Sequence, residues 1–115
     1  MSVQSVFKNL QYAGRADGDR RSYEVLQGER GYLIVASNNR GGFNVSVVPL
    51  EAPEVIARRF HGQQITGAKI ARQSRRPDLF RDAFAPLSAL YVMVALGRAR
   101  KLQKREGRAM VFKIQ

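Results

Sequence analysis

The chain has 115 residues, of which 44% are hydrophobic and 25% charged, a composition typical of one compact globular domain. It contains no cysteine, which excludes disulfides, thiolate metal sites and thiol nucleophiles. The 20 Lys and Arg residues outnumber the 9 Asp and Glu residues, so the formal net charge is +11. No apolar run reaches the roughly 20 residues that a membrane span needs, and the N-terminus lacks a leader-like apolar segment. We therefore expect a cytoplasmic protein that does not contact a membrane.

The positive charge is confined to one half of the chain. Residues 1–57 contain six basic and six acidic residues, whereas residues 58–115 contain fourteen basic and three acidic residues. Fifteen of the twenty basic residues are arginines, which favour bidentate contacts with phosphate over simple solvation. A solvated surface would account for a uniform excess of charge. The asymmetry between the halves instead indicates a polyanionic partner that faces one side of the protein.

The first half of the chain predicts a small antiparallel sheet. Residues 22–26 and 32–37 are rich in β-branched and aromatic side chains, and they flank a loop with two glycines that suits a hairpin. Residues 43–48 alternate with period two after a turn rich in Asn and Gly, and Pro49 ends this strand. The polar stretch 13–21 is expected to be a connection. The pattern predicts a three-stranded antiparallel meander.

Three aromatic residues on these strands allow two interpretations. Tyr23, Tyr32 and Phe43 could form a face on which single-stranded bases stack. Aromatic residues of a small sheet more often point into the core, and this is the interpretation that we favour here.

The second half of the chain predicts three helices. Residues 51–62 form a short helix with acidic residues near its start and basic residues near its end. Thr66 is a suitable N-cap for a second helix over residues 67–73. Residues 87–96 form a third helix between a proline and Gly97, and this helix is apolar on almost all sides. A helix of this kind belongs in the centre of a core.

Residues 98–114 predict a basic β-hairpin at the end of the chain. The favoured connection is a three-residue loop at 105–107, which places Leu102 opposite Met110 and buries both. A two-residue turn at Glu106 and Gly107 would instead pair Met110 with Gln103 and Phe112 with Lys101. The alternation of the last strand is the same in both registers.

This order of elements resembles a winged helix-turn-helix domain. The resemblance covers roughly residues 53–114, and it is carried by "ITGAKIARQ" (residues 65–73) as the second helix and by residues 87–114 as the third helix and wing. It implies binding of nucleic acid, with the third helix in the major groove and the wing on phosphates. One departure weakens base reading, since only Ser88 and Tyr91 give the third helix polar groups. Its apolar surface should be covered by the N-terminal sheet or by a second subunit.

The predicted fold is therefore α+β in a single compact domain over residues 1–115. Residues 1–50 form the N-terminal three-stranded antiparallel meander, and residues 51–115 form a winged-helix-like half with a basic β-hairpin. The predicted function is non-enzymatic binding of nucleic acid through phosphate contacts, with duplex DNA favoured over RNA. The basic residues expected at this site are Lys69, Arg72, Arg75, Arg76, Arg98, Arg100, Lys101, Lys104, Arg105 and Arg108.

The alternative is a homodimeric protein-interaction module whose basic charge is not used for nucleic acid. Its interface would be the apolar surface of helix 87–96 or the N-terminal sheet. The charges on the hairpin would then protect an edge strand against aggregation. The arginine cluster at 72–76 favours the nucleic-acid interpretation, because edge protection does not require it.

Enzymatic chemistry has no support in the sequence. His61 is the only histidine, the few carboxylates do not form a metal-site pattern, and nothing in the sequence supports a glycosidase pair. The chain has no glycine-rich motif that would bind the phosphates of a nucleotide. We expect no enzymatic activity, no metal and no cofactor.

Overall fold

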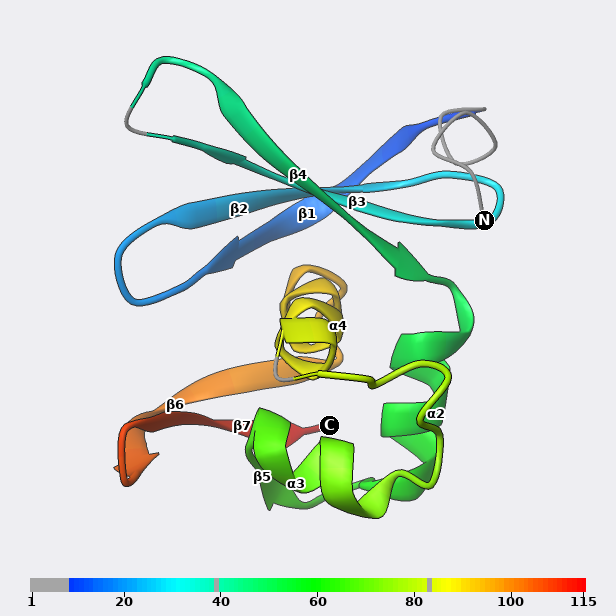
Figure 1. Cartoon of the computed structure of the whole chain (residues 1–115), viewed down its shortest axis with the longest axis vertical. Coiled ribbons are helices and arrows are strands. Elements are labelled where there is room, and N and C mark those ends of the chain that lie inside the picture. The colour runs from blue at the N-terminus through cyan, green and yellow to red at the C-terminus, as the bar shows by residue number, and fades with distance from the viewer. Residues whose placement is uncertain (1–8, 39, 83) are drawn as a thin grey trace.

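The computed structural model describes residues 9–38, 40–82 and 84–115, and this part of the chain has a mixed α+β fold. Four antiparallel strands form one sheet in sequence order, and three strands form a second sheet in the order β5-β7-β6. Helix α4 lies between the two sheets (Figure 1). The elements are β1 (Gln11–Asp17), β2 (Ser22–Gln27), β3 (Gly31–Ser37), β4 (Phe43–Pro49), α2 (Glu51–Arg59), β5 (Gln64–Ile65), α3 (Gly67–Gln73), α4 (Phe84–Ala95), β6 (Ala99–Glu106) and β7 (Ala109–Ile114).

The first sheet has one strand more than the sequence predicts. The additional strand is β1, which lies largely in the polar stretch that we expected to be a connection. Its residues on the face toward α4 are Gly14 and Ala16, which are too small to produce a hydrophobic alternation. Gly14 has a φ of 147°, and a Cβ atom there would overlap the carbonyl oxygen of Ala95 in α4. The close approach of β1 to α4 requires small residues on this face, and a strand with small inward residues lacks the hydrophobic alternation that predicts a strand.

The two faces of the first sheet have different environments. Its register places Val25 opposite Ile34 and Tyr32 opposite Val48, and all four side chains are buried. These residues belong to the same hydrophobic cluster as α4, so they form the inner face. Because side chains alternate along a strand, the residues between them point to the other side of the sheet. We call that side the outer face.

Only one of the three aromatic residues considered for base stacking points outward. Tyr23 lies on the inner face, where its ring stacks on Tyr91 of α4 at a centroid distance of 4.4 Å. Tyr32 is also on the inner face and is 5% exposed. Phe43 lies on the outer face and is 70% exposed. The favoured assignment to the core is therefore correct for both tyrosines and wrong for Phe43.

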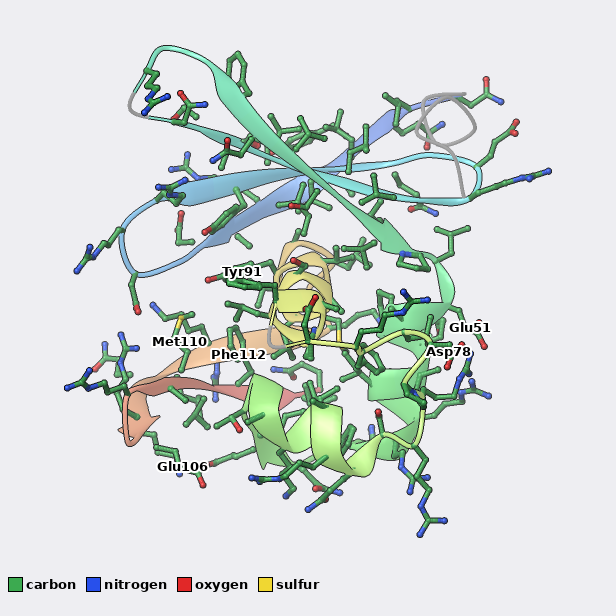
Figure 2. All side chains as sticks on the ribbon, in the orientation of Figure 1. Glu51, Asp78, Tyr91, Glu106, Met110 and Phe112 are labelled. Atoms are coloured by element: carbon green, nitrogen blue, oxygen red, sulfur yellow. The ribbon has the colours of Figure 1, made fainter. Side chains whose placement is uncertain are left out.

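Helix α4 joins the two sheets into one hydrophobic core. Leu90, Val92 and Met93 are fully buried, and the ring of Tyr91 meets Phe112 of β7 edge-on at 6.2 Å. Figure 2 shows Tyr91, Met110 and Phe112 between α4 and the β6–β7 hairpin. The first sheet thus covers the apolar surface of this helix. The apolar surface of helix 87–96 is therefore not available as the interface of a homodimer, because it packs within the chain.

The N-terminal ends of two helices are capped by side chains. The hydroxyl oxygen of Thr66 accepts a hydrogen bond from the backbone N–H of Lys69 at 3.2 Å, as the sequence predicts for α3. Asp82 accepts hydrogen bonds from the backbone N–H groups of Phe84 and Ala85, each at 2.9 Å. This cap explains why α4 begins at Phe84, three residues before the predicted start.

The favoured register of the hairpin is wrong, and the alternative register is correct at one pair, Lys101 with Phe112. The turn lies at Gly107 and Arg108, Lys101 pairs with Phe112, and Met110 pairs with Arg105. The register shifts between Lys101 and Arg105, so neither predicted pairing of Met110 is present. Pairs counted from a turn assume a regular ladder, and the irregularity between Lys101 and Arg105 breaks that regularity.

Candidate nucleic-acid interface

The structure divides the ten predicted basic residues into two groups. One group is paired with carboxylates of this chain, and the other makes no ion pair within the described residues. The paired group contains Arg76, Arg98, Lys101 and Arg105. A cation that is paired with a carboxylate of its own chain attracts an anionic partner less strongly than an unpaired one. The two groups are therefore described separately.

Arg76 bridges two carboxylates. Its Nε and Nη2 atoms donate to Oδ1 and Oδ2 of Asp78 at 3.0 and 2.8 Å, and its Nη1 atom donates to Oε1 of Glu51 at 2.8 Å. Figure 2 shows Glu51 and Asp78 side by side. Hydrogen bonds from Arg76 hold the pKa values of both carboxyl groups below their usual range. Arg76 therefore connects the segment after α3 to the first turn of α2.

Arg98 makes a similar structural contact at the start of the hairpin. It donates from Nη1 to Oε1 of Glu54 at 2.6 Å and from Nη2 to Oε2 at 3.3 Å, which is a bidentate pair. This contact lowers the pKa of Glu54 and raises the pKa of Arg98. It holds α2 against the connection between α4 and β6.

Asp19 connects the hairpin to the first sheet. It lies in the turn between β1 and β2, where its Oδ1 atom accepts a hydrogen bond from Nη2 of Arg105 at 2.5 Å. The Nζ atom of Lys101 lies 3.2 Å from the same oxygen. The hydrogen bond from Arg105 lowers the pKa of Asp19. A residue of the N-terminal half therefore compensates part of the positive charge of the hairpin.

The second group stays open to a partner. Lys69 is half-buried, and its Nζ atom donates to the side-chain oxygen of Gln63 at 3.3 Å. The remaining five side chains are exposed and make no ion pair with any described residue. They are Arg72 and Arg75 at and after the end of α3, and Arg100, Lys104 and Arg108 on the hairpin.

A hollow of about 430 Å³ lies beside the end of α3. It is lined by Arg58 and Arg59 of α2 and by Arg75 and Arg76, together with Val55 and Ser74. The Nε atom of Arg59 donates to the backbone oxygen of Gln73 at 2.7 Å, which fixes this arginine between the two helices. Arg75 has a φ of 59°, in the left-handed region that a non-glycine residue rarely adopts. Two arginine pairs that are far apart in the sequence thus meet around one concave surface.

Arg58 and Arg59 line the site but were not predicted as site residues. In the sequence they are cations that suit the C-terminal end of a helix. The available signal was the pair of adjacent arginines at 58–59 and a second pair at 75–76, but their proximity depends on how α2 packs against α3.

Helix α3, and not α4, presents polar side chains to solvent. Arg72 and Gln73 are exposed and Lys69 is half-buried, whereas Ile70 is fully buried beneath them. Helix α3 lies on the side of α4 opposite the first sheet, next to the hairpin (Figure 1). If a helix contacts a groove of a nucleic acid, these side chains belong to α3.

Comparisons with known proteins do not assign a family or a function to this chain. No family model, no curated protein and no solved structure matches this chain. In residues 9–38, 40–82 and 84–115, no group of three His, Asp or Glu side chains is placed to hold a metal ion, and His61 is exposed. None of the helices in this part of the chain is long and apolar enough to span a membrane.

Proposed function

We propose that this protein is a non-enzymatic binder of nucleic acid that contacts the phosphates of duplex DNA. The contact surface is α3, the arginine-lined hollow beside it and the tip of the β6–β7 hairpin. The observation that carries this proposal is the hollow, where Arg58, Arg59 and Arg75, which make no ion pair with a described residue, lie around one concave surface beside the paired Arg76. Guanidinium groups bind phosphate oxygens in a bidentate way, and release of counterions then favours the complex.

The order of elements in the C-terminal half supports this proposal. Helix, strand, two helices and two strands follow one another from α2 to β7, and β5 pairs with β7 beside β6. This is the order of a winged helix-turn-helix domain, so we propose a winged-helix-like arrangement for residues 51–114. The proposal differs from the usual docking geometry in one respect. The third helix is covered by the first sheet, so α3 takes the groove-facing position.

The residues of the surface predict how binding is specified. Lys69, Arg72 and Gln73 give α3 only a few groups for base edges, and most of the surrounding cations suit phosphates. We therefore expect shape and deformability of the duplex to matter more than direct base reading.

The first test is equilibrium binding to a labelled duplex of random sequence, measured by fluorescence anisotropy at several salt concentrations. We expect log K to fall linearly with log salt, with a slope that corresponds to several phosphates. A matched single-stranded RNA and a polyglutamate chain serve as competitors. Binding that polyglutamate displaces as well as unlabelled duplex does would contradict the proposal, because the charge would then be unspecific.

A double variant locates the contact. Arg72→Gln combined with Arg75→Gln should lower the magnitude of the salt slope by about 2, since each phosphate contact contributes about 0.9. The control is Arg30→Gln combined with Arg40→Gln, which removes the same charge from exposed turns of the first sheet. An equal loss of binding in both double variants would show that only the net charge matters.

The outer face of the first sheet favours a second candidate function, a homodimeric interaction module. Phe43 and Val45 are 70% and 52% exposed there, and Tyr12 is 63% exposed. Exposed apolar residues on one face can mark a contact with another protein. Sedimentation velocity over a range of protein concentrations tests this candidate, and a single monomeric species at all concentrations would contradict it.

A further inference from the structure

The outer face of the first sheet has a polar end and an apolar end. The strand registers place Arg15 beside Glu24, Glu24 beside Val35 and Val35 beside Val45 in one row across the sheet. Nearer the β1–β2 turn, Ser22 at the start of β2 pairs with the last residue of β1, and Phe43 at the start of β4 pairs with Ser37. The opposite end of the face carries leucine and valine.

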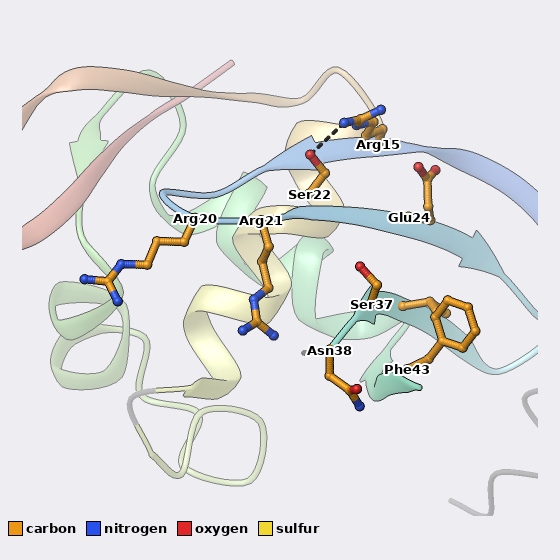
Figure 3. A pocket seen from close by; sticks show the side chains of 9 residues that line it. Arg15, Arg20, Arg21, Ser22, Glu24, Ser37, Asn38 and Phe43 are labelled. Carbon is orange, nitrogen blue, oxygen red and sulfur yellow. Dashed lines mark hydrogen bonds between the residues drawn. The ribbon is translucent and has the colours of Figure 1, made fainter. Parts of the chain in front are cut away.

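A hollow of about 690 Å³ lies at the polar end of this face. Arg15, Arg20 and Arg21 line it from β1 and the β1–β2 turn, and Phe43 lines it from β4 (Figure 3). Asn38 and other polar side chains complete the wall. A cationic wall and an aromatic wall thus face one concave surface, far from the C-terminal clusters in sequence and on the other side of α4.

The arginines of this hollow differ in how strongly they are held. The Nη2 atom of Arg15 donates to the hydroxyl oxygen of Ser22 at 2.7 Å, and its Nε atom lies 3.3 Å from Asp17. Arg20 and Arg21 are exposed and make no ion pair with another residue of the described chain. Two guanidinium groups of this hollow are therefore available to an anionic ligand.

The one carboxylate that lines the hollow is partly engaged. Glu24 lies opposite Arg15 in the β1–β2 pair, and its Oε2 atom accepts a hydrogen bond from the hydroxyl group of Tyr12 at 2.5 Å. The hydroxyl group of Tyr12 fixes this carboxylate without neutralising it. Three arginines and one carboxylate line the hollow, so it keeps an excess of positive charge.

The position of Phe43 is fixed by the turn that precedes it. The Oδ1 atom of Asn38 accepts hydrogen bonds from the backbone N–H groups of Arg40 and Gly42 at 2.9 and 3.0 Å. Phe43 then pairs with Ser37 at the start of β4, and its ring stays 70% exposed. The turn and the strand thus hold the backbone at Phe43, and the exposed ring offers a face on which a planar group can stack.

We propose that this hollow binds single-stranded nucleic acid, with a base stacked on Phe43 and adjacent phosphates on Arg20 and Arg21. Single strands present both unstacked base faces and phosphates, and proteins bind them with aromatic rings beside a basic groove. A duplex hides its base faces, and an isolated phosphate does not require the aromatic wall. A second copy of this chain fits less well, because a symmetric contact would bring two sets of arginines to one interface. This site is separate from the duplex-binding surface and does not depend on it.

The test uses the absence of tryptophan from the chain. In the variant Phe43→Trp, the indole is the only tryptophan, so its fluorescence reports on this site alone. Titration with decathymidylate and with decauridylate, which do not form duplexes, should quench the fluorescence in a saturable way. The two oligonucleotides distinguish DNA from RNA as the source of the single strand.

Three variants assign the contacts in anisotropy measurements with the same oligonucleotides. Phe43→Leu should weaken single-strand binding by about 5-fold to about 100-fold, the range for loss of one base stack. Arg20→Gln combined with Arg21→Gln should weaken it and lower the magnitude of the salt slope by about 1.4, the value for two phosphates of a single strand. Val45→Ala is the control, since Val45 is an exposed residue of the same face and strand that does not line the hollow.

Several results would overturn the proposal. One is single-strand binding with no tryptophan quenching, because the strand would then bind elsewhere. Another is an equal effect of Val45→Ala and Phe43→Leu. A third is a concentration-dependent dimer that Phe43→Asp converts to a monomer while single-strand binding is unchanged, which would assign the face to a second copy of the chain. Loss of duplex binding in the Arg72 and Arg75 double variant has no bearing on these measurements.

Discussion

The two sheets pack on opposite sides of α4 and differ in how they hold their charge. The C-terminal half carries the whole net charge of the chain, yet four of its predicted contact residues are paired with carboxylates. The N-terminal half has no net charge, yet it gathers three arginines around one hollow. The carboxylate of Asp19 even compensates cations of the opposite half. Charge counted along the chain therefore locates a polyanion partner only coarsely, and the pairing in the folded state decides which cations are available.

The largest expected effect concerns the helix that both regions share. Leu90 is fully buried in α4, and Leu90→Ala should lower the free energy of unfolding by about 2–5 kcal/mol because it leaves a cavity in the common core. Urea unfolding should show one transition, with far-ultraviolet and tyrosine near-ultraviolet circular dichroism coinciding. The exposed Val45→Ala is the control, with an expected change within about 0.5 kcal/mol. Two separate transitions would show that the two regions fold independently.

The next effect concerns the contact between β1 and α4. Gly14→Ala should lower the free energy of unfolding by about 1–3 kcal/mol, because the new methyl group overlaps the backbone of Ala95 and one element must move. The control is Gly42→Ala, where the nearest atom to the new Cβ lies 3.4 Å away in the side chain of Asn38. Equal stability of both variants in urea unfolding would contradict the close packing of the first sheet on α4.

The smallest effect concerns the ion pairs that neutralise the C-terminal cations. Arg98 lowers the pKa of Glu54 below its ordinary value of 4.5 in the folded state. Glu54 therefore stabilises the fold above that value, and its contribution is lost as the pH falls through the lowered pKa. Because the pair is partly exposed, Glu54→Gln should cost less than about 1 kcal/mol at pH 7.

The measurement is urea unfolding of the wild type and of Glu54→Gln at pH 7 and pH 3. The stability difference between the two proteins should shrink at pH 3, where the carboxyl group of the wild type is increasingly protonated. A difference that stays constant between the two pH values would mean that Glu54 acts through packing and not through its charge.

Local patterns in the sequence predicted much of the fold. β-Branched and aromatic residues located β2 and β3, alternation with period two located β4, and Thr66 marked the start of α3. The apolar run before Gly97 located α4 and its central position. These elements depend on the burial of regularly spaced side chains or on a cap within a few residues, so they can be predicted from short stretches of sequence.

The errors concern features that no local alternation of residues indicates. Strand β1 was missed because a glycine stands where the strand contacts α4, and the favoured hairpin register was wrong because the ladder shifts between Lys101 and Arg105. The candidate site shows the same limit. The sequence identified Arg72 and Arg75, but it could not distinguish them from Arg76, whose partner Glu51 lies 25 residues away. Such pairings depend on how the elements pack.

The most direct test of the account compares two double variants against two ligands. Arg72→Gln with Arg75→Gln should weaken binding to a labelled duplex and leave binding to decathymidylate close to that of the wild type. Arg20→Gln with Arg21→Gln should do the reverse. The measurement is fluorescence anisotropy at one fixed salt concentration, since all affinities of this kind depend on salt. If each double variant weakens both ligands to the same extent, the protein has no separate binding surfaces and its positive charge acts only as a whole.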